Sequence, residues 1–152
     1  MEETLSRADR AAALFESGYS CGQAVVCAFA DQMGLSEEDA LLLSAALGGG
    51  LCRMRETCGA FTGALIVLGK VCGSADAADT QAKAALYAQG QLIGIQFQQR
   101  FGTLCCRELI NLPKDAPLSP VPTPRTPEFY DKRPCTCFVR EAARLLAEQV
   151  GE

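Results

Sequence analysis

Apolar residues recur at intervals of three and four along most of this chain, and glycine or polar stretches separate the segments that carry them. That spacing is typical of amphipathic helices, and no stretch alternates apolar and polar residues as a strand would. The sequence therefore predicts an all-α bundle of about six helices in a single domain spanning residues 1–152. The expected helical segments are 4–17, 20–34, 36–47, 58–71, 74–100, a short one within 103–111, and 138–148.

Two segments depart from this amphipathic pattern. The most apolar part of the chain is AFTGALIVLG at 60–69, which is shorter than the roughly 20 residues that cross a bilayer. We expect it to form the central buried helix and not a membrane span. Residues 112–134 hold all seven prolines, which predicts an extended loop before the C-terminal helix. This loop acts either as a tether over the surface or as a Pro-rich ligand for a partner.

The composition narrows the class of protein. Hydrophobic residues make up 49% of the 152 residues and charged residues 21%, which fits a globular domain with a sizeable core. The formal net charge of −4 gives no general basic surface, so a nucleic-acid partner is not expected. The chain has no histidine, which excludes Ser-His-Asp and Cys-His catalysis within one chain and leaves thiolate, carboxylate or backbone as metal ligands.

Nine cysteines are a high number for a chain of this length. The N-terminal segment MEETLSRADR is acidic and amphipathic and has no apolar signal core, so we expect a cytoplasmic location. In that setting, cysteine-rich proteins more often carry redox or metal chemistry than stabilising disulfides. The alternative for any single cysteine is a role as a small buried hydrophobic residue.

Cys58 is the strongest candidate for chemistry. It stands where the long apolar helix should begin, and Cys21 stands in the first turn of the second helix, after the expected cap Ser20. Unpaired N–H groups and the positive end of the helix dipole favour a thiolate at such positions, so we expect both thiols to have a lowered pKa. Cys105 and Cys106 are adjacent, so on a helix their side chains point about 100° apart and face different surroundings.

Glycines and arginines surround Cys58 in the sequence. Gly59 and Gly63 are four residues apart, which lets another helix approach closely, and they are also candidates for cofactor binding. Arg53 and Arg55 precede Cys58. They either form a solvated entry to the helix, or they favour the thiolate and hold an anionic substrate.

Four cysteine-containing blocks, taken together, resemble a known family. CGAFTG at 58–63, preceded by GGG and followed by ALIVLG, is similar to the core motif of the redox-active proteins named for a C_GCAxxG_C_C signature. The family's other cysteine blocks are similar to GYSCGQAV at 18–25, FGTLCCREL at 101–109 and PCTCFVREAA at 134–143, in the same order. The resemblance implies one helical domain with a cysteine site. It adds less about the reaction, because the family is called redox-active on the basis of its cysteines.

The resemblance also implies which cysteines form that site. The family's four cysteines fall on Cys21, Cys58, Cys106 and Cys135. Cys106 is favoured over Cys105 because it directly precedes the REL segment, and Cys135 is favoured over Cys137 because of its distance from Val139. The remaining cysteines, which are implied to be additions of this chain, are Cys27, Cys52, Cys72, Cys105 and Cys137.

Three functions are consistent with these residues. In the first, an oxidoreductase role, Cys58 is the attacking thiolate and Cys21, Cys106 or Cys135 resolves the disulfide, with a redox protein or a small-molecule oxidant or reductant as partner. In the second, the same four cysteines bind an iron–sulfur cluster or zinc. In the third, the chain is a non-enzymatic helical interaction module. The sequence alone leaves the reaction, and the formation of a homodimer, open.

Overall fold

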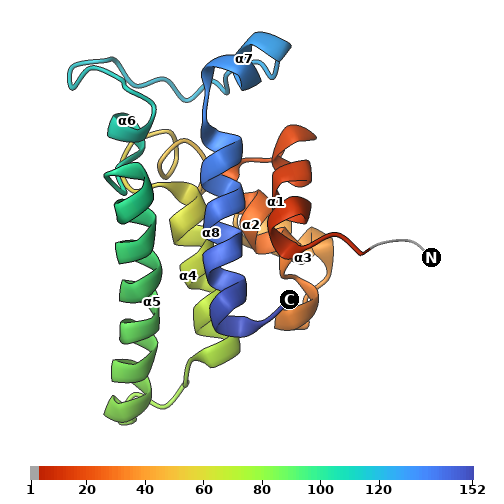
Figure 1. The fold of residues 1–152 in the computed structure, drawn as a ribbon, viewed down its shortest axis with the longest axis vertical. Helices are drawn as coiled ribbons and strands as arrows, with labels where there is room; N and C mark the ends of the chain where they lie inside the picture. The colour runs from red at the N-terminus through yellow and green to blue at the C-terminus, as the bar shows by residue number, and fades with distance from the viewer. Residues whose placement is uncertain (1–3) are drawn as a thin grey trace.

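The computed structural model describes residues 4–152, which form helices joined by loops (Figure 1). The elements are α1 (Arg7–Glu16), α2 (Cys21–Ala28), η1 (Asp31–Met33), α3 (Glu37–Leu43), α4 (Gly59–Cys72), α5 (Thr80–Phe101), α6 (Cys106–Leu109), α7 (Pro127–Lys132) and α8 (Cys135–Val150). The described residues thus contain eight α-helices, one 3-10 turn and no strand. The predicted all-α fold is confirmed.

The helices bury one continuous apolar core. Helix α8 packs against α1, α2, α4 and α5, and α2 also packs against α4 (Figure 1). On α8, the side chains of Val139, Ala142, Ala143 and Leu146 are fully buried. Their spacing of three and four residues is the helical stripe that the sequence predicts, and small residues within it let the neighbouring helices approach closely. None of the helices formed by residues 4–152 is long and apolar enough to cross a membrane.

Side-chain caps fix where several helices begin. Ser20 Oγ accepts a hydrogen bond from the N–H of Gln23, and Gln23 Oε1 accepts one from the N–H of Ser20, which completes a capping box. This cap makes Cys21 the first residue of α2. Asp79 caps α5 in a similar way, by accepting from the N–H of Ala82.

The second and third helices are shorter than expected. The second ends at Ala28 and is followed by η1, and the third ends at Leu43. Ser44 is fully buried, and its hydroxyl donates to the carbonyl of Ala40 at 2.6 Å, a side-chain bond that competes with the helical pattern. Residues 44–57 are therefore a loop.

Two further boundaries differ from the prediction. Helix α5 begins at Thr80 and not at Ser74, because Asp79 supplies its cap. The Pro-rich segment is not extended throughout, because α7 begins within it at Pro127. Proline is tolerated at the first helical position, where its missing N–H would have no partner in any case.

Glycines allow α2 and α4 to cross closely. A Cβ on Gly63 would lie 2.9 Å from the carbonyl oxygen of Gly22, and one on Gly59 would lie 2.8 Å from Cys21 Sγ and still nearer to the carbonyl oxygen of Leu47. Side chains at these positions would force the two helices apart. Gly59 and Gly63 thus have a packing role, and their role in cofactor binding stays a prediction.

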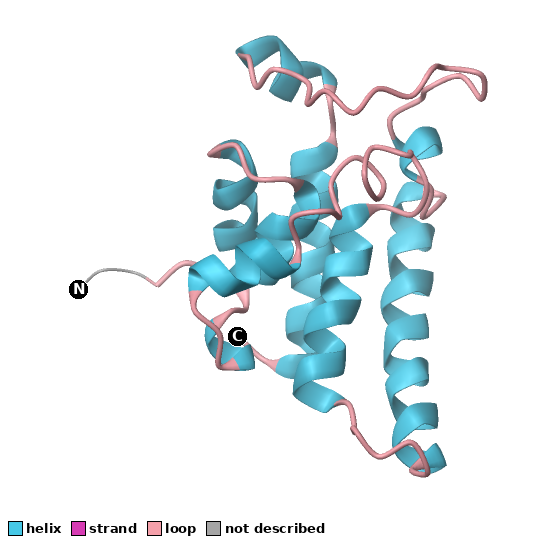
Figure 2. Ribbon diagram, turned by 180° about the vertical axis from the view of Figure 1, so that it is seen from behind, coloured by secondary structure: helices cyan, strands magenta, loops and turns pink. Residues whose placement is uncertain are grey.

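The loops gather at one end of the bundle. Figure 2 shows loop 44–57 and the Pro-rich segment together at the end where α6 and the N-terminus of α8 also lie. A hydrogen bond of 2.8 Å from Arg53 Nε to the carbonyl of Ser119 joins the two loops. The same end contains the candidate site.

Candidate functional site

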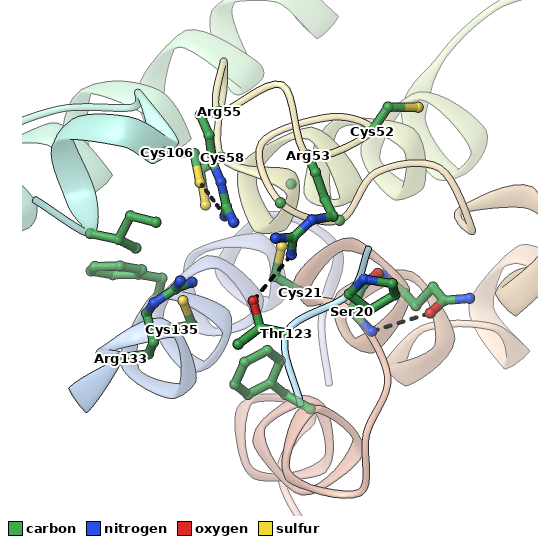
Figure 3. A pocket seen from close by; sticks show the side chains of 18 of the residues that line it. Ser20, Cys21, Cys52, Arg53, Arg55, Cys58, Cys106, Thr123, Arg133 and Cys135 are labelled. Carbon is green, nitrogen blue, oxygen red and sulfur yellow. Dashed lines mark hydrogen bonds between the residues drawn. The ribbon is translucent and has the colours of Figure 1, made fainter. Parts of the chain in front are cut away.

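A pocket of about 550 Å³ lies at this end, enclosed by helices and by the two loops (Figure 3). Four of its lining cysteines come from four different helix starts: Cys21 is the first residue of α2, Cys58 caps α4, Cys106 is the first residue of α6, and Cys135 is the first residue of α8. These are the four cysteines that the family resemblance selects. The structure brings all of them to one cavity.

A short antiparallel contact brings the segments of Cys58 and Cys106 together. Thr57 pairs with Cys105 in an isolated bridge. The N–H of Cys58 donates to the carbonyl of Leu104 at 2.7 Å, and the N–H of Cys106 donates to the carbonyl of Glu56 at 2.6 Å. Successive side chains of a strand-like segment point to opposite sides, so Cys58 and Cys106 share one side of this contact.

Cys105 faces away from the pocket. Its thiol donates to the carbonyl of Arg55 at 3.5 Å, and its side chain is not among those that line the cavity. The adjacent Cys106 lines the cavity and is buried. The backbone pairing therefore separates the two neighbours, as the sequence predicts for adjacent residues.

Cys21 lies against the start of α4. The N–H of Ala60 acts to lower the pKa of both Cys21 and Cys58, although burial outweighs it. The N–H groups of Gly49 and Gly22 act on the pKa of Cys21 in the same direction. Because Gly59 has no side chain, nothing separates Cys21 from this helix start.

The remaining cysteines lie at the margin of the pocket or outside it. Cys52 borders the cavity, but it is exposed and its side chain points away from the other thiols (Figure 3). Cys137 is exposed and does not line the cavity, whereas Cys135 does. Cys27 is buried in the core, and Cys72 lies at the end of α4, where Gln89 Nε2 approaches its sulfur at 3.9 Å.

The loop before Cys58 has an unusual backbone. Gly49 and Gly50 have φ of 66° and 69°, and Leu51, Cys52 and Arg53 continue with φ of 67°, 47° and 57°. Left-handed backbone costs a residue with a side chain roughly 1–2 kcal/mol, so it is rare in consecutive residues. The loop is closed by hydrogen bonds such as the one from the N–H of Cys52 to the carbonyl of Ala46, at 2.8 Å. This turn directs Arg53 toward the pocket (Figure 3).

Positive charge gathers around the thiols although the whole chain is acidic. Four arginines line the pocket, Arg53, Arg55, Arg125 and Arg133, and none of the described residues that line it is Asp or Glu. Arg55 is only 7% exposed, and its Nη1 lies 3.8 Å from Cys106 Sγ. A solvated helix entry, one of the two roles expected for Arg55, is therefore wrong.

Burial determines the ionisation of Cys58. The side chain is 4% exposed, and burial raises the pKa of its thiol well above the usual range. Charge on Cys21 would raise this pKa further, while the N–H groups of Phe61 and Ala60 act in the opposite direction without reversing the shift. The expected lowering of the pKa at the helix start is wrong for Cys58, because desolvation of the thiolate outweighs the helix terminus.

Cys21 and Cys135 behave in the same way. Burial raises the pKa of Cys21, and charge on Cys106 adds to the effect. Burial and then charge on Cys21 raise the pKa of Cys135 to about 11. The expected lowering at Cys21 is thus also wrong, and the pocket holds these thiols in their neutral form at neutral pH.

Across residues 4–152, no three Cys, Asp or Glu side chains are grouped so that they could hold a metal ion. The binding of zinc or an iron–sulfur cluster by Cys21, Cys58, Cys106 and Cys135 stays a prediction.

The Pro-rich segment supplies part of the site that the sequence did not identify. Pro120, Pro122 and Thr123 line the pocket, and Thr123 Oγ1 accepts from Arg53 Nη1 at 3.3 Å. Arg125 donates to the carbonyl of Phe15 at 2.9 Å, which ties the segment to α1. The proline run predicts a tether, but no pattern in the sequence indicates that this tether covers the thiols.

Comparison with known proteins agrees with the resemblance seen in the sequence. No curated protein and no solved structure matches this chain. The family model described as "Putative redox-active protein (C_GCAxxG_C_C)" matches residues 19–149, a range that contains all four cysteines of the pocket. This chain belongs to the C_GCAxxG_C_C family of redox-active proteins.

Proposed function

We propose that this protein performs dithiol–disulfide chemistry and that Cys21 and Cys58 form its reversible disulfide. The observation that carries the proposal is the convergence of four thiols from four helix starts on one pocket. Cysteines that serve only as packing need no shared cavity, as the buried Cys27 illustrates.

The choice of Cys21 and Cys58 rests on their common surroundings. Cys21 Sγ lies 2.8 Å from the position of a Cβ on Gly59, the residue that follows Cys58. Charge on Cys21 also raises the pKa of Cys58, as expected for neighbouring thiols. Both thiols have raised pKa values, so neither is held as an anion in the reduced protein. A disulfide is uncharged, and its formation places no charge in the buried site.

Cys106 is the better candidate for the attacking thiolate. The guanidinium of Arg55 lies beside its sulfur and stabilises negative charge there. The Cys106 thiolate attacks an acceptor disulfide and releases one thiolate, which takes the proton of Cys58. Cys58 then attacks Cys106 Sγ and releases the second thiolate, which takes the proton of Cys21. Cys21 finally attacks Cys58 Sγ and releases Cys106 as a thiolate. Two protein thiols become a disulfide, and the acceptor takes up two electrons and two protons as two thiols.

Thiol counting tests the proposal. Reduced protein is treated with diamide without oxygen, the remaining thiols are titrated in denaturant, and linked peptides are mapped by mass spectrometry. We expect the loss of a pair of thiols and a Cys21–Cys58 peptide. Cys58→Ser should show neither, whereas Cys21→Ser should stop at a Cys58–Cys106 disulfide and give no Cys21–Cys58 peptide. Cys137→Ser is the matched control, because Cys137 is exposed and outside the pocket.

Two outcomes would overturn the proposal. One is an unchanged thiol count with no disulfide at Cys58. The other is protein purified without oxygen that carries zinc or an iron–sulfur absorption spectrum, with the metal lost in Cys58→Ser. The second outcome would establish the metal-binding alternative.

A further inference from the structure

We infer that the pocket selects a small anionic disulfide as its redox partner, and that Arg55, Arg53 and Arg133 bind its carboxylate or phosphate groups. This inference rests on the proposed function, because it names the substrate class of the same thiols. It is carried by the charge and burial of the residues that surround them.

Arg55 is the central observation. Its side chain is more than nine-tenths buried, and the six ion pairs found among residues 4–152 do not include it. The one hydrogen bond that its side chain makes among these residues goes to Cys106 Sγ. A buried guanidinium without a carboxylate is costly, and an anion entering the pocket would supply the missing partner.

Arg53 and Arg133 place two more positive charges at the same cavity. Figure 3 shows the three guanidinium groups directed toward the space between the sulfurs. The pKa of Arg53 is lowered by burial and then by the charges of Arg55 and Arg133, so Arg53 is close enough to each of them to be repelled. An anion placed between them would relieve this repulsion.

The backbone also adds positive charge to the pocket. Helices α2, α4 and α8 each have at least eight residues and begin at the pocket wall. Their N-terminal ends carry partial positive charge. With no acidic residue on the described lining, the cavity favours anions and disfavours cations throughout.

The size and wall of the cavity set further limits on the ligand. A volume of about 550 Å³ lies within the range of sites for small molecules. Phe15, Phe129 and Phe138 form an apolar part of the wall. A short chain with an anionic group at each end and a disulfide in the middle would place its charges on arginines and its sulfurs beside Cys106.

Three small disulfides of nearly equal length test whether the charge of the oxidant determines its rate of reaction with the protein thiols. Reduced protein is mixed at low ionic strength with 3,3′-dithiodipropionate (anionic), bis(2-hydroxyethyl) disulfide (neutral) or cystamine (cationic), and the rate of thiol loss is measured. We expect the dianion to react at least roughly tenfold faster than cystamine, with a preference that shrinks as salt is added. Arg53→Gln and Arg133→Gln should reduce this ratio.

A non-reacting pair of ligands tests binding separately. Octanedioate has the length of dithiodipropionate without its sulfurs, and 1,6-diaminohexane similarly mimics cystamine. Calorimetric titration of the reduced protein should detect octanedioate but not the diamine. The signal should weaken in Arg53→Gln, Arg133→Gln and Arg55→Lys. The control is Arg140→Gln, which changes the net charge equally but removes an exposed arginine that pairs with Asp9.

The two arms separate failure of this inference from failure of the proposed function. Anion selection would be overturned if the three disulfides reacted at equal rates, or if Arg140→Gln weakened the binding of octanedioate as much as Arg53→Gln does. Either result would stand even if diamide still formed the Cys21–Cys58 disulfide. Selective binding of octanedioate with no thiol loss to any oxidant would instead retain the anion site and overturn the redox chemistry.

Discussion

Replacement of Gly59 by alanine tests whether close contact between α2 and α4 holds the site together. The added Cβ would lie 2.8 Å from Cys21 Sγ and nearer still to the carbonyl oxygen of Leu47, whereas ordinary contacts begin at 3.4 Å. The carbonyl belongs to the backbone and cannot rotate away. The start of α4 must therefore move relative to Leu47 and α2.

The expected loss in the free energy of unfolding can be compared with the effect of the same substitution at a second glycine of α4. Overpacking of a buried site typically costs about 1–3 kcal/mol, and the fixed backbone near Gly59 places it at the upper end, about 3 kcal/mol. Gly69 lies in α4 with nothing within 4 Å of its Cβ position. There, alanine should stabilise the helix by roughly 0.5–1 kcal/mol. Glycine-to-alanine substitution should therefore lower the free energy of unfolding at Gly59 and raise it at Gly69.

Urea unfolding of both variants under reducing conditions measures this difference. The midpoints are compared at a common slope, since a changed slope would indicate an altered unfolded or native state. Gly59→Ala should also form the Cys21–Cys58 disulfide more slowly, because Cys21 Sγ packs directly on Gly59. If Gly59→Ala is as stable as Gly69→Ala, the close crossing of α2 and α4 is refuted.

Three other perturbations have defined outcomes. Cys52→Gly should raise the free energy of unfolding by about 1 kcal/mol in denaturant titrations, because Cys52 has φ of 47°, whereas Cys52→Ala should not. The pKa of Cys135 is about 11 in the folded protein, against an ordinary value of 9.0. The free energy of unfolding should therefore fall as pH rises from 9 toward 11, by up to about 1.4 kcal/mol per pH unit for each such thiol. Cys135→Ser should reduce this slope. Glu141→Gln should cost roughly 1.5–3 kcal/mol, because the buried carboxylate accepts from Arg144 and Arg100. These contacts lower the pKa of Glu141, so its contribution should be present at neutral pH and lost as pH falls below the usual range of glutamate.

Helix positions were predictable where a local signal sets them. The cap at Ser20 and the apolar stripe of the last helix were both expected and are present, although α8 begins at Cys135, three residues earlier than predicted. The loop at 44–57 was not predictable, because its causes leave no mark on the spacing of apolar residues. The buried hydroxyl of Ser44 donates to the carbonyl of Ala40, and Leu51 to Arg53 continue the left-handed turn that two glycines begin.

The resemblance of four sequence blocks to the family selected four cysteines that line one pocket, but the surroundings of these cysteines were not predictable. Arg133 sits two residues before Cys135, and Arg125 lies among prolines, where nothing in the sequence connects it to a thiol site. Both reach the pocket only because the Pro-rich segment folds back over it, and Arg125 stacks on Phe15 at 4.4 Å. Contacts between segments about a hundred residues apart carry this information, and no local pattern contains it.

The ionisation of Cys58 depends more on burial than on its position at a helix start. A helix N-terminus stabilises a negative charge by about 0.3–1 kcal/mol, and up to about 2 kcal/mol in partly buried sites, which corresponds to at most about 1.5 pKa units. Removal of a charged group from water shifts its pKa by about 3–5 units. At 4% exposure, burial therefore decides the charge state of Cys58. In this pocket the guanidinium of Arg55 lies 3.8 Å from the sulfur of Cys106, and this contact, not a position at a helix start, is the reason for proposing Cys106 as the attacking thiol.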